Sequence, residues 1–227
     1  MPDTLIFLDK PAGITSAKAV ARVKRALGVR KAGHAGTLDP LATGLLIIGI
    51  NEGTKKLSEY LKLPKTYEAE ILLGLRTATG DLEGKVLEEK PVGEIAESAV
   101  QEALAGMVGT LELPVSPYSA LKRGGEPLYK KARRGEEVEP VIRNMEIRSA
   151  EFLGISETHH SSFLQKARMM PGVIVRTRFD VGSGTYIRSL AEELGRRLGY
   201  PATLAGLRRT RIGEFRIEDA KALSDFV

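Results

Sequence analysis

The chain has 227 residues, of which 42% are hydrophobic and 28% are charged, and its formal net charge is +5. This composition is ordinary for a globular protein and excludes a disordered chain, and no apolar run approaches the roughly 20 residues that span a bilayer. There is no cysteine, which excludes disulfides, thiolate zinc sites and cysteine nucleophiles. There are only three histidines, so few imidazoles are available to bind a metal. The few possible metal ligands lead us to expect chemistry that needs no metal and no redox cofactor. The N-terminus lacks the pattern of a signal peptide, so we expect a cytoplasmic protein.

The first part of the chain predicts two strands around one helix. It opens with a short strand that runs into a turn, within residues 4–13. Ser16 is expected to cap a helix that Gly28 ends. A loop rich in small residues follows at 33–44, and it leads into an apolar strand at 44–50. The apolar positions of the helix recur at helical spacing: Val20, Val23 and Leu27.

The rest of the chain mixes strands with few helices. Residues 66–74 and 173–184 alternate apolar and polar side chains, as half-buried strands do. Regular strand–helix alternation is missing, so we predict an α+β fold with a mixed, mainly antiparallel central sheet flanked by helices, in a single domain over 1–227. The other expected elements are helices at 54–61, 95–104, from Thr185 and at 218–226, strands at 141–155 and 211–217, a turn-rich loop at 77–85, a basic segment at 114–135 that ends in a helix, and a polar insertion at 156–172.

Basic side chains gather in three segments, at 22–31, 130–134 and 208–211. Each segment alone is typical of a solvated helix face or loop. Together with the positive net charge, they favour an anionic partner such as a nucleic acid, whose phosphates they would hold.

The loop at 33–44 matches none of the common catalytic motifs. A phosphate loop needs Lys followed by Ser or Thr after its second glycine, and His34 stands there instead. Elsewhere in the chain, the GSG at 182–184 is not a nucleophile elbow, because that motif needs G-x-S-x-G. A glycosidase would need a second acid near the loop, and the sequence does not place Asp81 or Glu83 there.

Asp39 is the single carboxylate of this loop. Pro40 restricts its backbone, and Gly36 and Gly44 permit sharp turns, so the loop can present one side chain rigidly. A structural alternative is an Asx-turn in which Asp39 only caps its own loop.

The run GHAGTLDPLATGLL closely resembles the catalytic motif of the TruB family, the bacterial tRNA pseudouridine synthases. Further blocks resemble that family in the same order along the chain. They are DKPAGITS, KTYEAEILLGLRTATGDLEG, SPYSALKRGGEPLYKKARRGEEV, GSGTYIRSLAEELG and LRRTRIGEF.

The resemblance implies isomerisation of one uridine to pseudouridine, usually at position 55 in the T-loop of tRNA. On this basis Asp39 is the catalytic nucleophile, Arg188 pairs with it, and Tyr67 stacks on the flipped base. Substrate and product are isomers, so no cofactor is expected. Flipping a base costs a few kcal/mol, which stacking worth roughly 1–3 kcal/mol per base offsets in large part.

Three further residues are implied to bind the substrate. His34 would enter the T-loop, Tyr186 would contact the nucleotide, and Leu207 would line the uracil pocket. Without the resemblance, the pattern alone would class Tyr67, Tyr186 and Leu207 as packing residues and His34 as an ordinary loop histidine.

The sequence departs from the family at three places. Ala35 replaces a hydroxyl residue, usually Thr, the insertion at 156–172 is unexpected, and we expect no C-terminal RNA-binding domain of PUA type. We predict a monomer that acts on tRNA without a membrane or an obligatory protein partner. A catalytic subunit of a guide-RNA complex and a non-catalytic RNA-folding chaperone are the alternatives.

Overall fold

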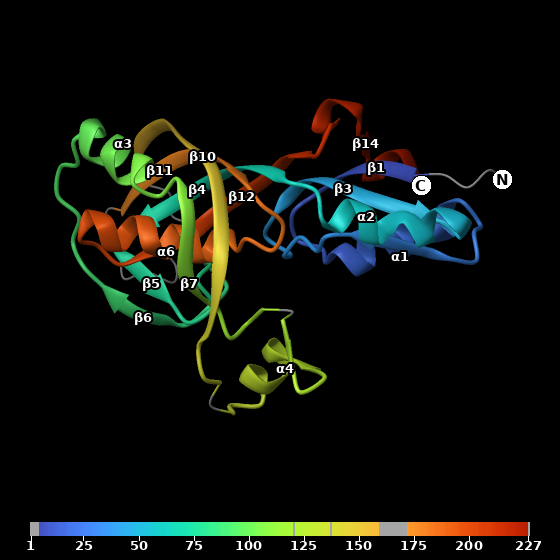
Figure 1. Cartoon of the computed structure of the whole chain (residues 1–227), viewed down its shortest axis with the longest axis horizontal. Helices are drawn as coiled ribbons and strands as arrows, with labels where there is room; N and C mark the ends of the chain where they lie inside the picture. Colours follow the sequence, from blue (N-terminus) through green and yellow to red (C-terminus); the bar gives the residue numbers. More distant parts are fainter. Residues whose placement is uncertain (1–4, 120, 137, 159–171, 227) are drawn as a thin grey trace. The chain divides into compact units, whose positions relative to one another are not determined.

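The computed structural model describes residues 5–119, 121–136, 138–158 and 172–226 (Figure 1). The chain divides into two compact units. Unit 1 comprises Met1–Glu68, Phe179–Gly184 and Gly206–Val227, and unit 2 comprises Ala69–Arg178 and Thr185–Ala205. The expectation of a single catalytic domain stays a prediction.

The described elements are mostly strands. The strands are β1 Leu5–Lys10, β2 Ala32–Ala35, β3 Thr43–Ile50, β4 Lys65–Leu73, β5 Leu75–Thr77, β6 Val86–Glu89, β7 Gly109–Val115, β8 Lys122–Arg123, β9 Glu126–Pro127, β10 Val141–Thr158, β11 Gly172–Val181, β12 Ala202–Ile212, β13 Phe215–Arg216 and β14 Lys221–Ala222. The helices are α1 Ser16–Ala26, α2 Leu57–Leu61, α3 Glu97–Ala105, α4 Leu128–Arg133 and α6 Ile187–Leu198, with 3-10 turns η1 Asn51–Lys56, η2 Ile217–Asp219 and η3 Leu223–Phe226.

In the described residues, ten strands belong to one mixed sheet, and β4, β11 and β12 contribute residues to both units. The neighbouring strands β14-β1-β3 lie wholly in unit 1, and β10-β7 lie wholly in unit 2. The pairs β1–β3, β2–β3, β7–β10 and β12–β13 are antiparallel, whereas β1–β14 and β3–β12 are parallel. The predicted α+β class with a mainly antiparallel sheet is therefore confirmed.

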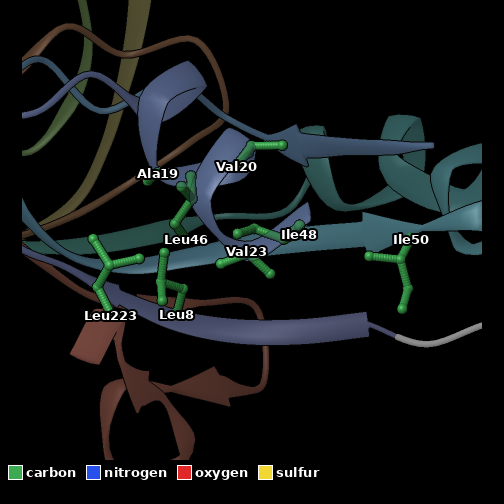
Figure 2. Close-up of a cluster of buried hydrophobic side chains, with 8 residues drawn as sticks. All are labelled: Leu8, Ala19, Val20, Val23, Leu46, Ile48, Ile50 and Leu223. Carbon is green, nitrogen blue, oxygen red and sulfur yellow. The ribbon is translucent and has the colours of Figure 1, made fainter. Parts of the chain in front are cut away.

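Helix α1 packs on one face of the sheet in unit 1. Figure 2 shows Val23 of α1 beside Leu46 and Ile48 of β3 and Leu8 of β1, and all four side chains are buried. A second cluster, around Leu45, covers the opposite face of β3. Strand β3 is thus buried on both faces, which is why the run at 44–50 is apolar without alternation.

The predicted cap of α1 is wrong by one residue. Thr15 is the N-cap, and its hydroxyl accepts a hydrogen bond from the backbone N–H of Lys18 at 3.1 Å. Ser16 is the first residue of the helix and is 1% exposed. Its hydroxyl bonds instead to the backbone of Leu38.

The alternating and amphipathic segments fold as predicted. In β4 the side chains of Tyr67, Ala69, Ile71 and Leu73 are buried, whereas Glu70 is exposed. Helices α3 and α6 bury their apolar stripes, and α4 ends the basic segment as expected. The predicted helix at 54–61 is split between η1 and α2.

Three local predictions are wrong. Residues 32–35 form the strand β2 rather than a loop, because β3 supplies a pairing edge that the local sequence does not indicate. The expected strand at 211–217 is a hairpin that turns at Gly213, whose φ is +57°. The expected helix at 218–226 is two 3-10 turns and β14, because Asp225 accepts a hydrogen bond from Ala222 N–H and closes a turn.

Most of the predicted polar insertion, at residues 159–171, lies outside the described residues. Among the helices that the structure describes, none combines the length and the apolar character needed to cross a membrane.

Candidate active site

The six residues singled out from the sequence fall in two groups. In unit 1, His34 lies on β2, Asp39 in the connection from β2 to β3, and Tyr67 and Leu207 on β4 and β12. In unit 2, Tyr186 and Arg188 lie at the start of α6. The predicted pairing of Asp39 with Arg188 stays a prediction.

We call residues 36–42 the Asp39 loop. It is anchored by its own backbone, since Ala42 N–H donates to the Asp39 carbonyl at 3.1 Å and Gly13 N–H donates to the Pro40 carbonyl at 2.8 Å. The Asp39 side chain is half-buried. A residue in this position can be held still and yet remain accessible.

Ser16 fixes the middle of the Asp39 loop. Its buried hydroxyl donates to the Leu38 carbonyl at 3.0 Å and accepts from Leu38 N–H at 2.9 Å. Both backbone groups of the residue before Asp39 are therefore satisfied by one side chain of α1.

Lys10, at the end of β1, holds the other side of the Asp39 loop. Its side chain is fully buried, and Nζ donates to the carbonyls of Pro11 at 2.9 Å, Ile14 at 2.8 Å and Pro40 at 3.5 Å. Burial lowers the pKa of Lys10 to about 8, and the charge of Asp39 opposes this shift. Lys10 therefore acts on Asp39 both through the backbone of Pro40 and through its charge.

Arg209, on β12, spans the two ends of the Asp39 loop. It is 1% exposed, and its guanidinium donates to the Gly36 carbonyl at 3.0 Å and to the Leu45 carbonyl at 2.8 Å. The same guanidinium lies 6.0 Å from the centre of the Tyr67 ring, within the range of a cation–π contact.

Gly44 allows β12 to lie close to the end of the Asp39 loop. Its φ is +103°, and a Cβ there would stand 2.7 Å from the backbone nitrogen of Arg209. Only glycine fits at this position, because both the backbone angle and the space exclude a side chain.

The surroundings of His34 disfavour the charged form of its ring. Burial, together with the nearby charge of Arg209, lowers the pKa of His34 below 6.5. Its Nδ1 is buried, and no hydrogen-bond partner is found for that atom among the described residues.

Unit 2 holds Arg188 in a buried polar network. Its Nη1 donates to the Thr79 carbonyl at 2.9 Å and to the Asp81 carboxylate at 3.4 Å. Asp81 also accepts from the Thr79 hydroxyl at 2.6 Å and from Glu83 N–H at 3.0 Å. Tyr186 is the N-cap of α6, and its carbonyl accepts from Ser189 N–H.

The arginines of the basic segment at 208–211 have partners within the protein, and the expectation that this segment holds phosphates stays a prediction. Arg208 is paired with Asp9 at 2.7 Å, Arg211 with Asp180 at 2.9 Å, and Arg209 is buried. Arg208 and Arg211 remain partly exposed beside their carboxylate partners, whereas Arg209 bonds only to backbone carbonyl groups among the described residues. In contrast, the described side chains of Arg22 and Arg25 on α1 are exposed.

Sequence reasoning missed four residues that organise these networks: Lys10, Ser16, Asp81 and Arg209. Lys10 and Ser16 stand in the matched block DKPAGITS, and Arg209 in LRRTRIGEF, so the blocks contained them without indicating a role. For Asp81 the sequence indicates only a possible second acid of a glycosidase. In the described part of the chain, no group of three or more His, Asp or Glu side chains could hold a metal ion.

Comparison with known families and proteins gives consistent matches. A family model described as TruB family pseudouridylate synthase (N terminal domain) matches residues 24–187. The chain is 43% identical over 222 residues to tRNA pseudouridine synthase B of Aromatoleum aromaticum, covering 98% of this chain and 67% of that protein. It is 44% identical over 212 residues to the protein of the same name from Xanthomonas euvesicatoria, covering 93% of this chain and 64% of that protein. The chain thus spans about two thirds of the length of these curated relatives.

Solved structures share the fold. A Cbf5–Nop10–Gar1 complex matches with a TM-score of 0.69 and 28% identity, over 97% of this chain and 52% of that chain. A structure of an H/ACA RNP bound to a substrate RNA containing 2′-deoxyuridine matches with a TM-score of 0.68 and 27% identity, over 97% of this chain and 51% of that chain.

Proposed function

The chain belongs to the TruB family of pseudouridylate synthases, and from this premise we propose that it isomerises a uridine of tRNA to pseudouridine. The proposed target is the T-loop uridine at position 55, flipped out of its stack before reaction. The reaction breaks the N-glycosidic bond, turns the base and forms a carbon–carbon bond, so it needs no redox equivalent.

Asp39 is the proposed nucleophile. The observation that carries this proposal is that the Asp39 loop is held at three points by buried side chains, namely Lys10, Ser16 and Arg209. These anchors fix the backbone on both sides of a half-buried carboxylate, which supports its use as a positioned nucleophile. Lys10 places a positive charge near Asp39, and Arg188 is proposed to add a second one beside the carboxylate that would act as nucleophile.

The substrate contacts follow from the same assignment. Tyr67 is proposed to stack on the flipped base, Tyr186 to contact the nucleotide, and Leu207 to line the uracil pocket. His34 is proposed to enter the T-loop, and its low pKa supports this role because an uncharged ring costs less to desolvate among bases.

The test is to incubate the purified chain with an unmodified tRNA transcript and to map pseudouridine by carbodiimide chemistry. One modified T-loop uridine is expected with wild type. Asp39→Asn should abolish modification and retain RNA binding, whereas Asp219→Asn, at an exposed aspartate, should leave both unchanged. Modification by Asp39→Asn would remove the nucleophile assignment.

The same experiment separates the alternatives. Binding without modification by wild type would favour the RNA chaperone. Modification that requires a guide RNA and added protein would favour a guide-RNA subunit, a reading suggested by the similarity to the Cbf5 complexes. The higher identity to tRNA pseudouridine synthase B supports the stand-alone enzyme.

A further inference from the structure

We infer that Arg209 is a positioning residue for catalysis, whose guanidinium sets the Asp39 loop and the Tyr67 ring relative to one another. This inference rests on the proposed function, because it concerns the geometry of the residues proposed to react with and stack on uridine.

The contacts of Arg209 reach both ends of the Asp39 loop. Gly36 begins the loop and Leu45 lies just beyond its end, and the two carbonyls accept from different nitrogens, Nη2 and Nε. The loop ends are therefore tied to one rigid planar group rather than to each other. An arginine is suited to this because its donors have a fixed fork geometry, which the single ammonium of lysine lacks.

A third contact of Arg209 is with the ring of Tyr67. The guanidinium carbon lies 6.0 Å from the centre of the Tyr67 ring, and Tyr67 is 9% exposed. One side chain on β12 thereby contacts the connection after β2 and a ring on β4. A shift of the guanidinium would move the carboxylate and the stacking ring relative to one another.

The surroundings of Arg209 are unusual for a residue that only stabilises the fold. Among the described residues, no carboxylate lies within ion-pair distance of its guanidinium, and its hydrogen-bond partners are carbonyl oxygens. A buried charge without a carboxylate partner is costly, and well-packed apolar residues often stabilise a core better. The contacts it makes, rather than the stability it adds, therefore account for an arginine here.

The charge of Arg209 also reaches the groups around the Asp39 loop. It lowers the pKa of Lys10, His34 and Lys65, which places these three side chains within its field. Any cation here would exert this field, whereas only a forked donor can hold both loop ends. The two roles can be separated by substitution.

The experiment compares Arg209→Lys and Arg209→Gln with wild type, and uses Arg216→Lys and Arg216→Gln as matched controls at an exposed arginine. Each protein is assayed for single-turnover formation of pseudouridine, for the Kd of unmodified tRNA and for thermal unfolding. Hydrogen exchange of the amides of residues 37–39, 41 and 42 reports the order of the loop directly.

We expect a single-turnover rate lowered by about 100-fold in Arg209→Gln and about tenfold in Arg209→Lys, since a misplacement of about 1 Å can cost that much. The Kd should change by less than about threefold, and loop amides should exchange faster in both variants than in the Arg216 controls. Should Arg209→Gln fail to fold, Arg209→Lys carries the test through the rate and the exchange measurement.

Three outcomes would overturn the inference. They are a folded Arg209→Lys with the wild-type rate and loop protection, a loss confined to Kd, and a loss matched by the Arg216 controls. An inactive wild type would instead contradict the proposed function, so the two failures are distinguishable.

Discussion

The guanidinium of Arg188 lies 3.4 Å from the carboxylate of Asp81, and the two side chains are only 10% and 6% exposed. Asp81 is in turn fixed by the Thr79 hydroxyl and by Glu83 N–H. Arg188 is thus oriented by a turn at 79–83 rather than by its own helix alone. The turn-rich loop that the sequence indicates at 77–85 is a support for the arginine proposed to assist Asp39.

Asp81→Asn is expected to slow the reaction while RNA binding stays near wild type. The amide keeps the shape of the side chain but loses the charge that holds Arg188. A hydrogen bond between charged groups contributes about 1.5–3 kcal/mol, which corresponds to roughly a 10- to 100-fold loss in single-turnover rate. Glu83→Gln, at an exposed carboxylate in the same turn, is the control. Equal rates for the two variants would show that Asp81 has no such role.

The fold could be predicted from the sequence wherever local pattern decides the structure. The alternation in β4 and the apolar stripe of α6 report burial directly, because one face of each element packs on the core. Strand β2 was missed because it has four residues, one of them glycine, and forms only by pairing with β3. Elements made by non-local pairing leave little local signal.

The site residues also differ in whether a local sequence pattern indicates them. Asp39 could be identified because a short motif surrounds it. Arg209 could not, because a run of arginines is usually solvated, and its contact with Gly36 joins residues 173 positions apart. A charged residue becomes a core residue only when the tertiary structure brings carbonyl oxygens to it, and no local pattern encodes that.

Ser16→Ala and Thr15→Ala should have different effects although the residues are adjacent. Ser16→Ala leaves both backbone groups of Leu38 without their partner, which should cost about 1–3 kcal/mol of unfolding free energy and lower the rate of the folded enzyme. Thr15→Ala removes a helix cap, which should cost about 1 kcal/mol without changing that rate. Urea unfolding and single-turnover assays measure both. The role of Ser16 in fixing the Asp39 loop would be rejected if Ser16→Ala lost stability but kept the wild-type single-turnover rate.

Arg22 and Arg25 are predicted to meet phosphates of the tRNA. Both are exposed on α1, and they line one side of a cavity of about 960 Å³ in unit 1. Substituting both by Gln should weaken tRNA binding and reduce the slope of log Kd against log salt by roughly 1 to 2, since each phosphate contact contributes about 0.7–0.9. Changing Arg216 and Lys221 to Gln removes the same charge and should leave the slope unchanged. A slope equal to wild type in the α1 variant would exclude these contacts.

The pH dependence of stability should reveal the buried lysines of unit 1. Lys65 is 6% exposed, its Nζ donates to the carbonyls of Leu61 and Leu63 at 2.6 Å, and burial with the charge of Arg209 lowers its pKa to about 8. The pKa of Lys10 is lowered to about 8 by its own burial. Below about pH 8 each lysine holds its proton in both the folded and the unfolded state. Between about pH 8 and 10.5 only the unfolded state holds it, so these groups make the free energy of unfolding rise with pH.

The comparison with Lys65→Met isolates this effect. Methionine is never charged, so the variant lacks the contribution of Lys65, and the stability of wild type relative to the variant should increase between pH 7.5 and pH 10. Urea unfolding at the two pH values measures this difference, and the ¹³Cε resonance of Lys65, assigned by its loss in the variant, should titrate near pH 8. A pH-independent difference between the two proteins, together with a Lys65 resonance that does not move near pH 8, would contradict the prediction. The two measurements test the same proton, one through its effect on folding and the other at the carbon bonded to Nζ, which carries it.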